Sequence, residues 1–315
     1  MMERFDIVVV GELNVDLILN NLPSLPEEGK EILAGAMNLT LGSSSAIFAS
    51  NAAVLNNRVA FIGKTGDDSF GNLVSAGLQS KGVNTEYIIR SSTEKTGATI
   101  VLNYGEDRAM VTYQGAMETL AMNDIDEDAL VRARHLHVSS IFLQPELKKE
   151  IITLFKKAKS LGLTTSLDMQ WDPGEKWDLD LDNLLPLVDI FLPNEVELLA
   201  ITKTKTVDDA IEILRPLINI MAIKMGNRGS RGVTKKQDVF QQPFLNNSVV
   251  DAIGAGDSFN AGFITKYIAG EPLKACLRYG NLVGAVNTTG SGGTGAFSNF
   301  EEFRNRAKKF FGMSV

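Results

Sequence analysis

Residues 251–262 read Asp251-Ala252-Ile253-Gly254-Ala255-Gly256-Asp257-Ser258-Phe259-Asn260-Ala261-Gly262. Three small residues, Gly254, Ala255 and Gly256, stand before Asp257 and a predicted apolar helix over Phe259–Ala269. Small residues let the backbone approach a ligand, and the free N–H groups at a helix start favour an anion there. A carboxylate beside bound phosphate is what transfer of a phosphoryl group to a hydroxyl requires. Spacing alone also fits Asp257 as an ordinary N-cap.

Short apolar runs alternate with helix-length segments through most of the chain. The predicted buried strands are Asp6–Gly11, Val59–Gly63, His135–Ser139, Leu163–Asp168, Asp189–Leu192 and Met221–Met225. The clearest helix is Glu146–Leu161, in which Leu147, Ile151, Leu154, Phe155 and Ala158 share one face. This alternation predicts an α/β fold with a mainly parallel sheet covered by helices on both faces.

Two regions interrupt this rhythm. Leu13–Leu41 holds short runs separated by prolines and glycines, and Thr96–Gln114 alternates as antiparallel strands do around a turn at Tyr104-Gly105-Glu106-Asp107. We expect these stretches to form one small sheet that acts as a lid over a site. The predicted division is a core of residues 1–12, 42–96 and 115–315, with a lid of residues 13–41 and 97–114.

Composition excludes several classes of protein. The net charge of −7 argues against a nucleic-acid binder, and the 315 residues hold a single cysteine, Cys276, so no intrachain disulfide forms. No apolar stretch reaches the ~20 residues of a membrane span, and the first ten residues lack a signal-peptide core. We therefore expect a cytoplasmic protein without a membrane partner.

Two other glycine-containing stretches fail as phosphate loops. Gly63-Lys64-Thr65 ends like a Walker A loop, but Arg58 stands where that loop needs glycine, which leaves a turn after a strand. Residues 290–295 match G-x-G-x-x-G, yet they follow a predicted helix, Leu273–Thr289, and not a strand. A dinucleotide-binding site is therefore not expected.

The stretch Asp251–Asp257 resembles the D-x-x-G-A-G-D signature of the PfkB, or ribokinase-like, family of carbohydrate kinases. The resemblance runs from about residue 6 to residue 300 and implies a doubly wound α/β core with a small β-sheet lid. It further implies that Asn14 and Asp16 hold sugar hydroxyls, and that Asn194 and Glu197 of Pro193-Asn194-Glu195-Val196-Glu197 help to place magnesium and phosphates. Residues 224–229 would form the nucleotide loop, and Asn281 would border the adenine.

The chain departs from the family pattern mainly on the substrate side. The family's glycine pair and nearby asparagine correspond here to Gly42, Ser43 and Ile47, and Asn51 follows one helical turn later. Phe142 stands near the position of a sugar-contacting glutamate of ribokinases, and Lys224 replaces a small threonine. Ser43, Ser44 and Ser45 fit either sugar binding or capping of the following helix. These departures predict a sugar or sugar acid other than plain ribose.

Several other candidate residues are better explained by structural roles than by a part in the chemistry. His135 and His137 alternate on a strand without a third ligand, so no metal site is expected. Asp168 ends a strand, where it either helps to hold magnesium through water or caps the next turn, and capping is favoured. Trp171 and Trp177 are expected to pack against the protein.

The sequence therefore predicts an ATP-dependent sugar kinase that uses Mg²⁺. The predicted catalytic residues are Asp257, Gly254, Ala255 and Gly256. The predicted sugar-binding residues are Asn14, Asp16, Gly42, Ser43, Ser44 and Asn51. The predicted nucleotide-binding residues are Asn194, Lys224, Gly226, Gly229 and Asn281. Glu197 would hold magnesium through water, and Asp251 would border a monovalent cation. A homodimer formed through the lid is expected, and a nucleoside kinase or a non-catalytic sensor of sugars or nucleotides remains the alternative.

Overall fold

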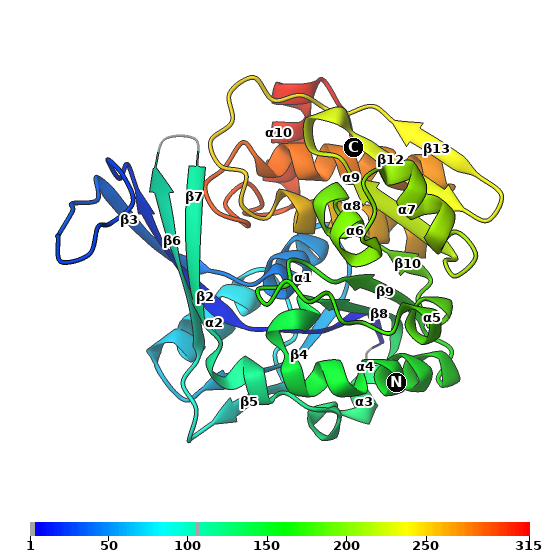
Figure 1. The fold of residues 1–315 in the computed structure, drawn as a ribbon, viewed down its shortest axis with the longest axis horizontal. Coiled ribbons are helices and arrows are strands. Elements are labelled where there is room, and N and C mark those ends of the chain that lie inside the picture. The colour runs from blue at the N-terminus through cyan, green and yellow to red at the C-terminus, as the bar shows by residue number, and fades with distance from the viewer. Residues whose placement is uncertain (1–3, 105–106) are drawn as a thin grey trace.

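A computed structural model of the chain describes residues 4–104 and 107–315. Its largest element is a nine-stranded sheet in the order β13-β12-β11-β10-β9-β8-β1-β4-β5 (Figure 1). These strands are β1 (Phe5–Val10), β4 (Val59–Gly66), β5 (Ile88–Ser91), β8 (Ala133–Ser139), β9 (Thr164–Asp168), β10 (Ile190–Phe191), β11 (Ile220–Lys224), β12 (Ser230–Thr234) and β13 (Asp238–Gln241). The strands from β11 to β5 pair in parallel, and β12 and β13 pair antiparallel at one edge. The predicted mainly parallel sheet is confirmed.

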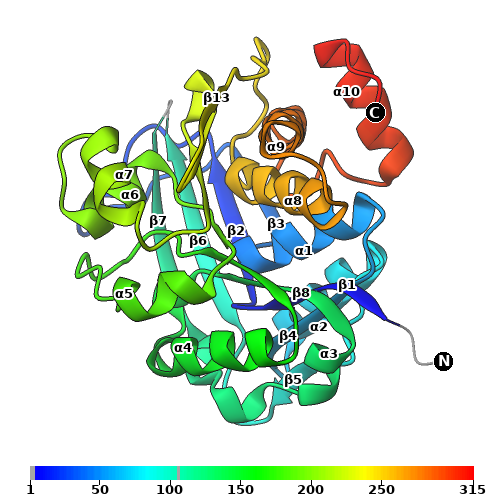
Figure 2. The same cartoon turned by 90° about the vertical axis from the view of Figure 1, so that its right-hand side faces the viewer.

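Helices cover both faces of this sheet. They are α1 (Ser44–Val54), α2 (Ser69–Ser80), α3 (Glu127–Val131), α4 (Pro145–Ser160), α5 (Leu181–Leu184), α6 (Glu195–Thr202), α7 (Val207–Leu214), α8 (Ala255–Ile268), α9 (Leu273–Asn287) and α10 (Phe300–Phe311). Short 3₁₀ turns are η1 (Gly115–Thr119), η2 (Met122–Asp124), η3 (Ile141–Leu143), η4 (Leu185–Leu187) and η5 (Gly226–Arg228). One core contains the apolar faces of α3 to α7, and the other those of α1, α2, α8, α9 and α10 (Figure 2).

Helix α4 shows how the sequence sets this layering. Its five predicted apolar residues are all buried, and Pro145 begins the helix, where a missing N–H costs no hydrogen bond. One local prediction was wrong: Gly63, Lys64 and Thr65 continue strand β4 to Gly66 and do not form a turn. Pairing with β5 as far as Gly66 extends this strand beyond its apolar run.

A second, four-stranded sheet stands beside the body in the order β3-β2-β6-β7 (Figure 1). Its strands are β2 (Asn14–Asn20), β3 (Ala36–Leu41), β6 (Gly97–Tyr104) and β7 (Asp107–Tyr113). The two interrupting stretches therefore do form one small sheet. The predicted turn between β6 and β7 includes Gly105 and Glu106, which lie outside the described residues.

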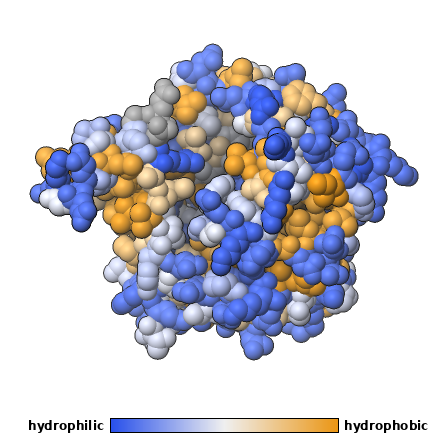
Figure 3. Space-filling model, viewed as in Figure 1, coloured by the Kyte–Doolittle hydropathy of each residue, from blue (hydrophilic) through white to orange (hydrophobic). Residues whose placement is uncertain are grey.

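One face of the small sheet is rich in exposed apolar side chains (Figure 3). Met37, Leu39, Ile100, Val111 and Tyr113 share this face and are each at least 40% exposed, whereas the exposed Met110 lies on the opposite face. Figure 3 also shows a hollow between this sheet and the body of the molecule. Within the described part of the chain, no helix is both long and apolar enough to cross a bilayer.

Candidate active site

Polar side chains gather at the carboxyl ends of four parallel strands. Glu12 follows β1, Asp168 ends β9, Asn194 follows β10 and Lys224 ends β11. Strand β1 lies between β4 and β8, so the chain winds in opposite directions from it. In open α/β sheets, ligands bind outside the carboxyl ends at such a switch point. The site therefore stands where the fold itself predicts one.

Helix α8 begins in the small-residue stretch. Gly254 is its N-cap, with φ of 74°, and a Cβ there would lie 2.6 Å from the Cα of Gly293 and 3.0 Å from Ile47 Cγ2. Only glycine suits this left-handed and crowded position. The helix starts at Ala255, four residues earlier than predicted, so Asp257 lies in its first turn and is not the N-cap. First-turn N–H groups have no intrahelical acceptor and are available to an anion.

Asp257 is buried beside other charged groups. Its Oδ1 accepts a hydrogen bond from Gln170 Nε2 at 2.9 Å. Burial raises the pKa of Asp257 well above its usual value, and the charge of Asp168 raises it further, whereas Lys224 and a hydrogen bond from Ser44 oppose the rise. A raised pKa makes a carboxylate a stronger base, which suits it to accept a proton.

Asp168 organises the groups around Asp257. Its Oδ2 accepts hydrogen bonds from Lys224 Nζ at 2.5 Å, from Gln170 Nε2 at 3.0 Å and from Asn260 Nδ2. Burial alone would lower the pKa of Lys224, but Asp168 and Glu197 together raise it, so this lysine is a cation. The favoured prediction for Asp168 was capping of the next turn, and its Oδ1 does accept from Gln170 N at 3.4 Å, while its Oδ2 lies at the centre of the cluster. Gln170 and Asn260 were not predicted at all.

Asn194 and Glu197 form a capping box at the start of α6. Asn194 N donates to Glu197 Oε2 at 2.9 Å, Asn194 Nδ2 donates to Oε1 at 2.7 Å, and Glu197 N donates to Asn194 Oδ1 at 2.9 Å. Burial and the charge of Asp168 raise the pKa of Glu197 to about 7, against the effect of Lys224. Both carboxylate oxygens are already hydrogen-bonded, so this side chain suits contact with a hydrated cation better than direct ligation.

The predicted nucleotide loop turns tightly after β11. Gly226 and Gly229 have φ of 54° and 98°, and a Cβ at Gly229 would lie 2.2 Å from the carbonyl oxygen of Gln241. Asn281 Nδ2 donates to the carbonyl oxygens of Gln241 at 3.2 Å and Gln242 at 2.9 Å. Asn281 therefore fixes the chain that leaves β13.

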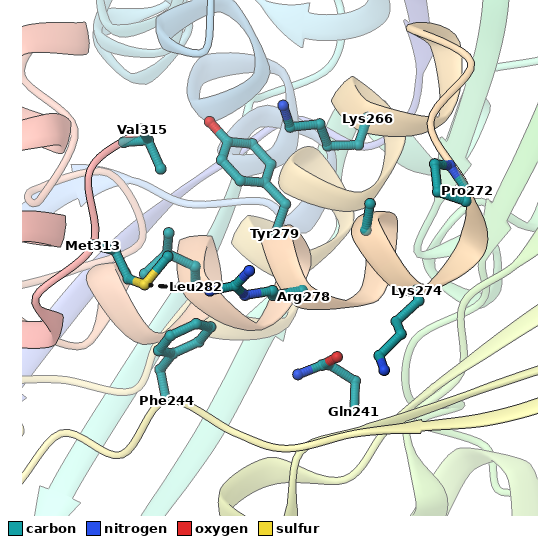
Figure 4. Close-up of a pocket in the computed structure, with 11 residues that line it drawn as sticks. Gln241, Phe244, Lys266, Pro272, Lys274, Arg278, Tyr279, Leu282, Met313 and Val315 are labelled. Atoms are coloured by element: carbon teal, nitrogen blue, oxygen red, sulfur yellow. Dashed lines mark hydrogen bonds between the residues drawn. The ribbon is translucent and has the colours of Figure 1, made fainter.

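A separate groove of about 430 Å³ runs along the outside of α9. Gln241, Phe244, Tyr279, Leu282, Met313 and Val315 are among its lining residues (Figure 4). Lys224, Asp168 and Asp257 do not line it. The groove is therefore distinct from the carboxylate cluster.

Asn14 and Asp16 lie together on β2 of the small sheet. Asn14 Nδ2 donates to Asp16 Oδ1 at 2.9 Å and to Thr99 Oγ1 at 3.1 Å. Gly42 passes so close that a Cβ there would lie 2.2 Å from Asp16 Oδ1. Burial, aided by the charge of Asp251, raises the pKa of Asp16 to about 6, whereas Asn14 lowers it. Asn14 Nδ2 also faces the carbonyl oxygen of Val15 at 3.1 Å, so its two N–H bonds are in use and the pair offers amide and carboxylate oxygens as acceptors for hydroxyl groups.

The three serines before α1 have different positions. Ser43 is the N-cap: its Oγ accepts from Ala46 N at 2.9 Å and donates to the carbonyl oxygen of Glu12 at 2.6 Å. Ser45 is fully buried and bonds the carboxylate of Glu12. Ser44 is the serine that bonds Asp257. The capping interpretation of Ser43 is therefore seen in the structure, Ser45 packs against Glu12, and sugar binding by Ser43 and Ser44 stays a prediction.

Asn51 and Asp251 tie loops together. Asn51 is fully buried and donates to Ser258 Oγ at 2.9 Å and to the carbonyl oxygen of Gly293 at 3.0 Å, so it joins α1 to α8 and does not line the sugar side as expected. Asp251 accepts from Ile253 N at 2.9 Å and from Gly292 N at 2.8 Å. Each therefore supports the glycine-rich segment beside the start of α8.

The remaining candidates pack inside the protein. His135 bonds Thr164 and Ser166, and His137 bonds Ser166 and stacks on Phe48. Burial lowers the pKa of His135 to about 3, so it is neutral.

A cluster of aromatic rings lies near the end of β9. Trp177 is in edge contact with both Phe142 and Trp171, as expected for packing residues. Trp171, however, is 46% exposed.

A helix start with free N–H groups, a buried carboxylate beside it and a neighbouring sheet that carries Asn14 and Asp16 are features that phosphoryl transfer to a hydroxyl group uses. Comparison with known proteins agrees. Residues 4–299 match the pfkB family carbohydrate kinase model, so the chain belongs to this family.

Known relatives share nearly the whole chain. The deoxyribokinase of Salmonella typhimurium is 30% identical over 306 residues, which covers 95% of this chain and 97% of that protein. The 2-dehydro-3-deoxygluconokinase of Bacillus subtilis is 27% identical over 301 residues, covering 92% of this chain and 91% of the relative. The Arabidopsis thaliana ribokinase, solved with ribose and ATP, superposes with a TM-score of 0.83 at 25% identity, covering 97% of this chain and 99% of that one. The protein is an ATP-dependent sugar kinase with a ribokinase-like fold.

Proposed function

We propose that this kinase phosphorylates a neutral sugar that lacks one of the hydroxyl groups of ribose. The observation that carries the proposal is the pair formed by Asn14 and Asp16, together with the apolar side chain of Ile47. The charged group of that pair is a carboxylate, and its pKa of about 6 leaves it ionised at neutral pH. The carboxylate of Asp16 would repel a negatively charged carboxylate or phosphate of the substrate at close range, whereas it would not repel a neutral sugar.

The position of Ile47 supports the proposal that the substrate lacks a hydroxyl group. It is 3% exposed, and it packs against the backbone of Gly254 and Gly293 beside the start of α8. A hydroxyl group placed against this apolar side chain would lose its hydrogen bonds with water and gain none. The deoxyribokinases among the relatives make 2-deoxyribose the first sugar to test.

In the proposed mechanism Asp257 accepts the proton of the substrate hydroxyl. The hydroxyl oxygen forms a bond to the γ-phosphorus of ATP as the bond between that phosphorus and the β,γ-bridging oxygen breaks, and ADP leaves. The N–H groups of residues 254–257 stabilise the charge on the phosphoryl oxygens. Lys224 holds Asp168 by a hydrogen bond, and the small sheet excludes water that would otherwise take the phosphoryl group.

Magnesium belongs to this proposal as an ion bound together with ATP, since the described residues hold no group of three or more His, Cys, Asp or Glu placed to bind a metal ion. Burial, together with the charge of Asp168, raises the pKa of Glu197, against the effect of Lys224. Bound with ATP, magnesium would neutralise the phosphates, with Asn194 and Glu197 holding its water. We also retain the proposal that Asp251 borders a monovalent cation, because its carboxylate lies in the loop that supports the α8 start.

We further propose a homodimer formed through the small sheet. Met37, Val111 and Tyr113 expose apolar surface on one face of a sheet whose outer edges, β3 and β7, are free to pair among the described strands. Because ATP is the phosphoryl donor, we place the activity in the cytoplasm.

The test is steady-state kinetics with ATP and four acceptors: 2-deoxyribose, ribose, 2-dehydro-3-deoxygluconate and adenosine. We expect kcat/KM for 2-deoxyribose to exceed that for ribose by about tenfold, which corresponds to about 1.4 kcal/mol. A preference for 2-dehydro-3-deoxygluconate would overturn the charge argument, and a preference for ribose would overturn the argument from Ile47. If adenosine were the best acceptor, the protein would be a nucleoside kinase. The exposed ring of Trp171 would then be the aromatic surface available to pack against the base. Binding of all four without turnover would indicate a sensor.

A further inference from the structure

The loop after β9 is built to hold one side chain in place. Asp172 accepts hydrogen bonds from the backbone N–H groups of Gly174 at 2.9 Å, Lys176 at 2.8 Å and Trp177 at 2.7 Å, which closes the loop on itself. Gln170 precedes this closure with φ of 59°, in the left-handed region. A residue with a Cβ adopts that conformation at a cost, so contacts of the side chain must stabilise it.

The Gln170 amide provides those contacts. Its Nε2 donates to Asp257 Oδ1 at 2.9 Å and to Asp168 Oδ2 at 3.0 Å, which uses both of its N–H bonds. One neutral group therefore bridges two buried carboxylates that would otherwise repel each other. Asp168 is fixed in turn by Lys224 and Asn260, so the bridge connects Asp257 to the rigid end of the sheet.

We propose that Gln170 is a positioning residue for phosphoryl transfer: its amide holds Asp257 Oδ1 and leaves Asp257 Oδ2 for the substrate hydroxyl. The inference rests on the proposed role of Asp257 as the base. It adds that this role depends on a neutral donor placed between Asp257 and Asp168. The group lies on a different element from the base, and 87 residues separate the two in the chain.

The bridge also affects the proton affinity of the base. The charged groups that face Asp257 are Asp168 from β9, Lys224 from β11 and Glu12 after β1, and Ser44 of α1 donates to it. Of these, the two carboxylates raise the pKa of Asp257, whereas Lys224 and Ser44 lower it. The Gln170 amide stabilises the charged form by a hydrogen bond, so its removal should make Asp257 bind a proton at higher pH.

The experiment compares Gln170→Met, Gln170→Glu and the unaltered kinase, each with its kcat measured from pH 5 to pH 9 at saturating sugar and ATP. Met keeps the length of the side chain and removes the donor, and Glu keeps the shape and adds a third carboxyl group. We expect the acid limb of kcat to move up by about one pH unit in Gln170→Met, since a hydrogen bond to a charged group has about that effect, and further in Gln170→Glu. At pH 7 kcat should fall about tenfold in Gln170→Met, and KM for ATP should stay unchanged.

Glu175→Met is the matched control. Glu175 belongs to the same loop and also has a left-handed backbone, with φ of 51°, but its side chain is exposed. Melting temperatures of all variants establish that they fold. Equal acid limbs in all folded variants, with or without a uniform loss of kcat, would overturn the inference. If Asp257→Asn retained activity, the proposed base itself would be wrong, so the two failures are distinguishable.

Discussion

Gly42→Ala should disable sugar binding and leave the nucleotide side intact. The added Cβ would lie 2.2 Å from Asp16 Oδ1 and 2.6 Å from Asn14 Nδ2, so both side chains must move. Movement breaks the 2.9 Å hydrogen bond between them and displaces both of their contacts with the substrate. A hydrogen bond to the charged Asp16 contributes about 1.5–3 kcal/mol and one to the neutral Asn14 about 0.5–1.5 kcal/mol, so the loss of both corresponds to about 3 kcal/mol. That is roughly a 10²-fold decrease in kcat/KM for the sugar.

The assay for Gly42→Ala combines sugar kinetics with calorimetric binding of an ATP analogue. The matched control is Gly77→Ala in α2. Its new Cβ would lie 3.6 Å from the side chain of Leu41, which is an ordinary van der Waals distance, and Leu41 precedes Gly42 in the chain. We expect the control to keep the kinetics of the unaltered kinase, and Gly42→Ala to bind the ATP analogue normally. An unchanged KM and kcat for sugar in Gly42→Ala would show that Asn14 and Asp16 do not hold the substrate.

Three further predictions concern the base, the buried carboxylate and the assembly. Asp257→Asn should fold and bind ATP but lose about 10²-fold or more in kcat, measured by coupled assay, and near-normal turnover would contradict its role as base. Because the pKa of Asp16 is raised to about 6, the folded state binds the extra proton between about pH 4 and pH 6, and the free energy of unfolding falls as the pH rises through that window. Asp16→Asn should therefore be more stable than the unaltered protein at pH 8, by up to about 3 kcal/mol, with the difference vanishing near pH 4 in thermal melts. Light scattering should show that the unaltered protein is a dimer. Val111→Lys places a charge on the exposed apolar face and should give a monomer. A monomeric unaltered protein at micromolar concentration would exclude the lid dimer.

The layering of the fold could be predicted because its signals are local. Helix α4 has its apolar residues on one face, and the strand β1 is a continuous apolar run, as expected for a strand covered on both faces. The small sheet was found because its two segments alternate where the rest of the chain does not. The start of α8 was missed by four residues, since Gly254 and Gly256 lower helix propensity and the collision of a Cβ at Gly254 with Gly293 is invisible in sequence.

The carboxylate cluster could not be predicted in full because its hydrogen bonds join distant parts of the chain. Asp168 is 56 residues from Lys224 and 92 from Asn260 along the sequence. Its position at the end of a buried strand was the one available signal, and capping explains that position equally well in sequence. Ser43 shows the same limit: the sequence could predict its capping of α1, but the hydrogen bond to the carbonyl oxygen of Glu12 joins residues 31 positions apart.

The charges of the site explain how Lys224 influences the transfer step although its side chain lies almost wholly inside the protein. Its Nζ lies 2.5 Å from Asp168 Oδ2, and the pKa of Lys224 is raised because Asp168 and Glu197 outweigh the effect of burial. Without this cation the Oδ2 of Asp168 would lose one of its three hydrogen-bond donors, and the carboxylate would be free to turn. Gln170 would then lose one end of its bridge, and Asp257 would lose its fixed place beside the α8 N-terminus. The lysine therefore acts on the base through two intermediates, and this places it among the groups that hold the geometry of the transfer step.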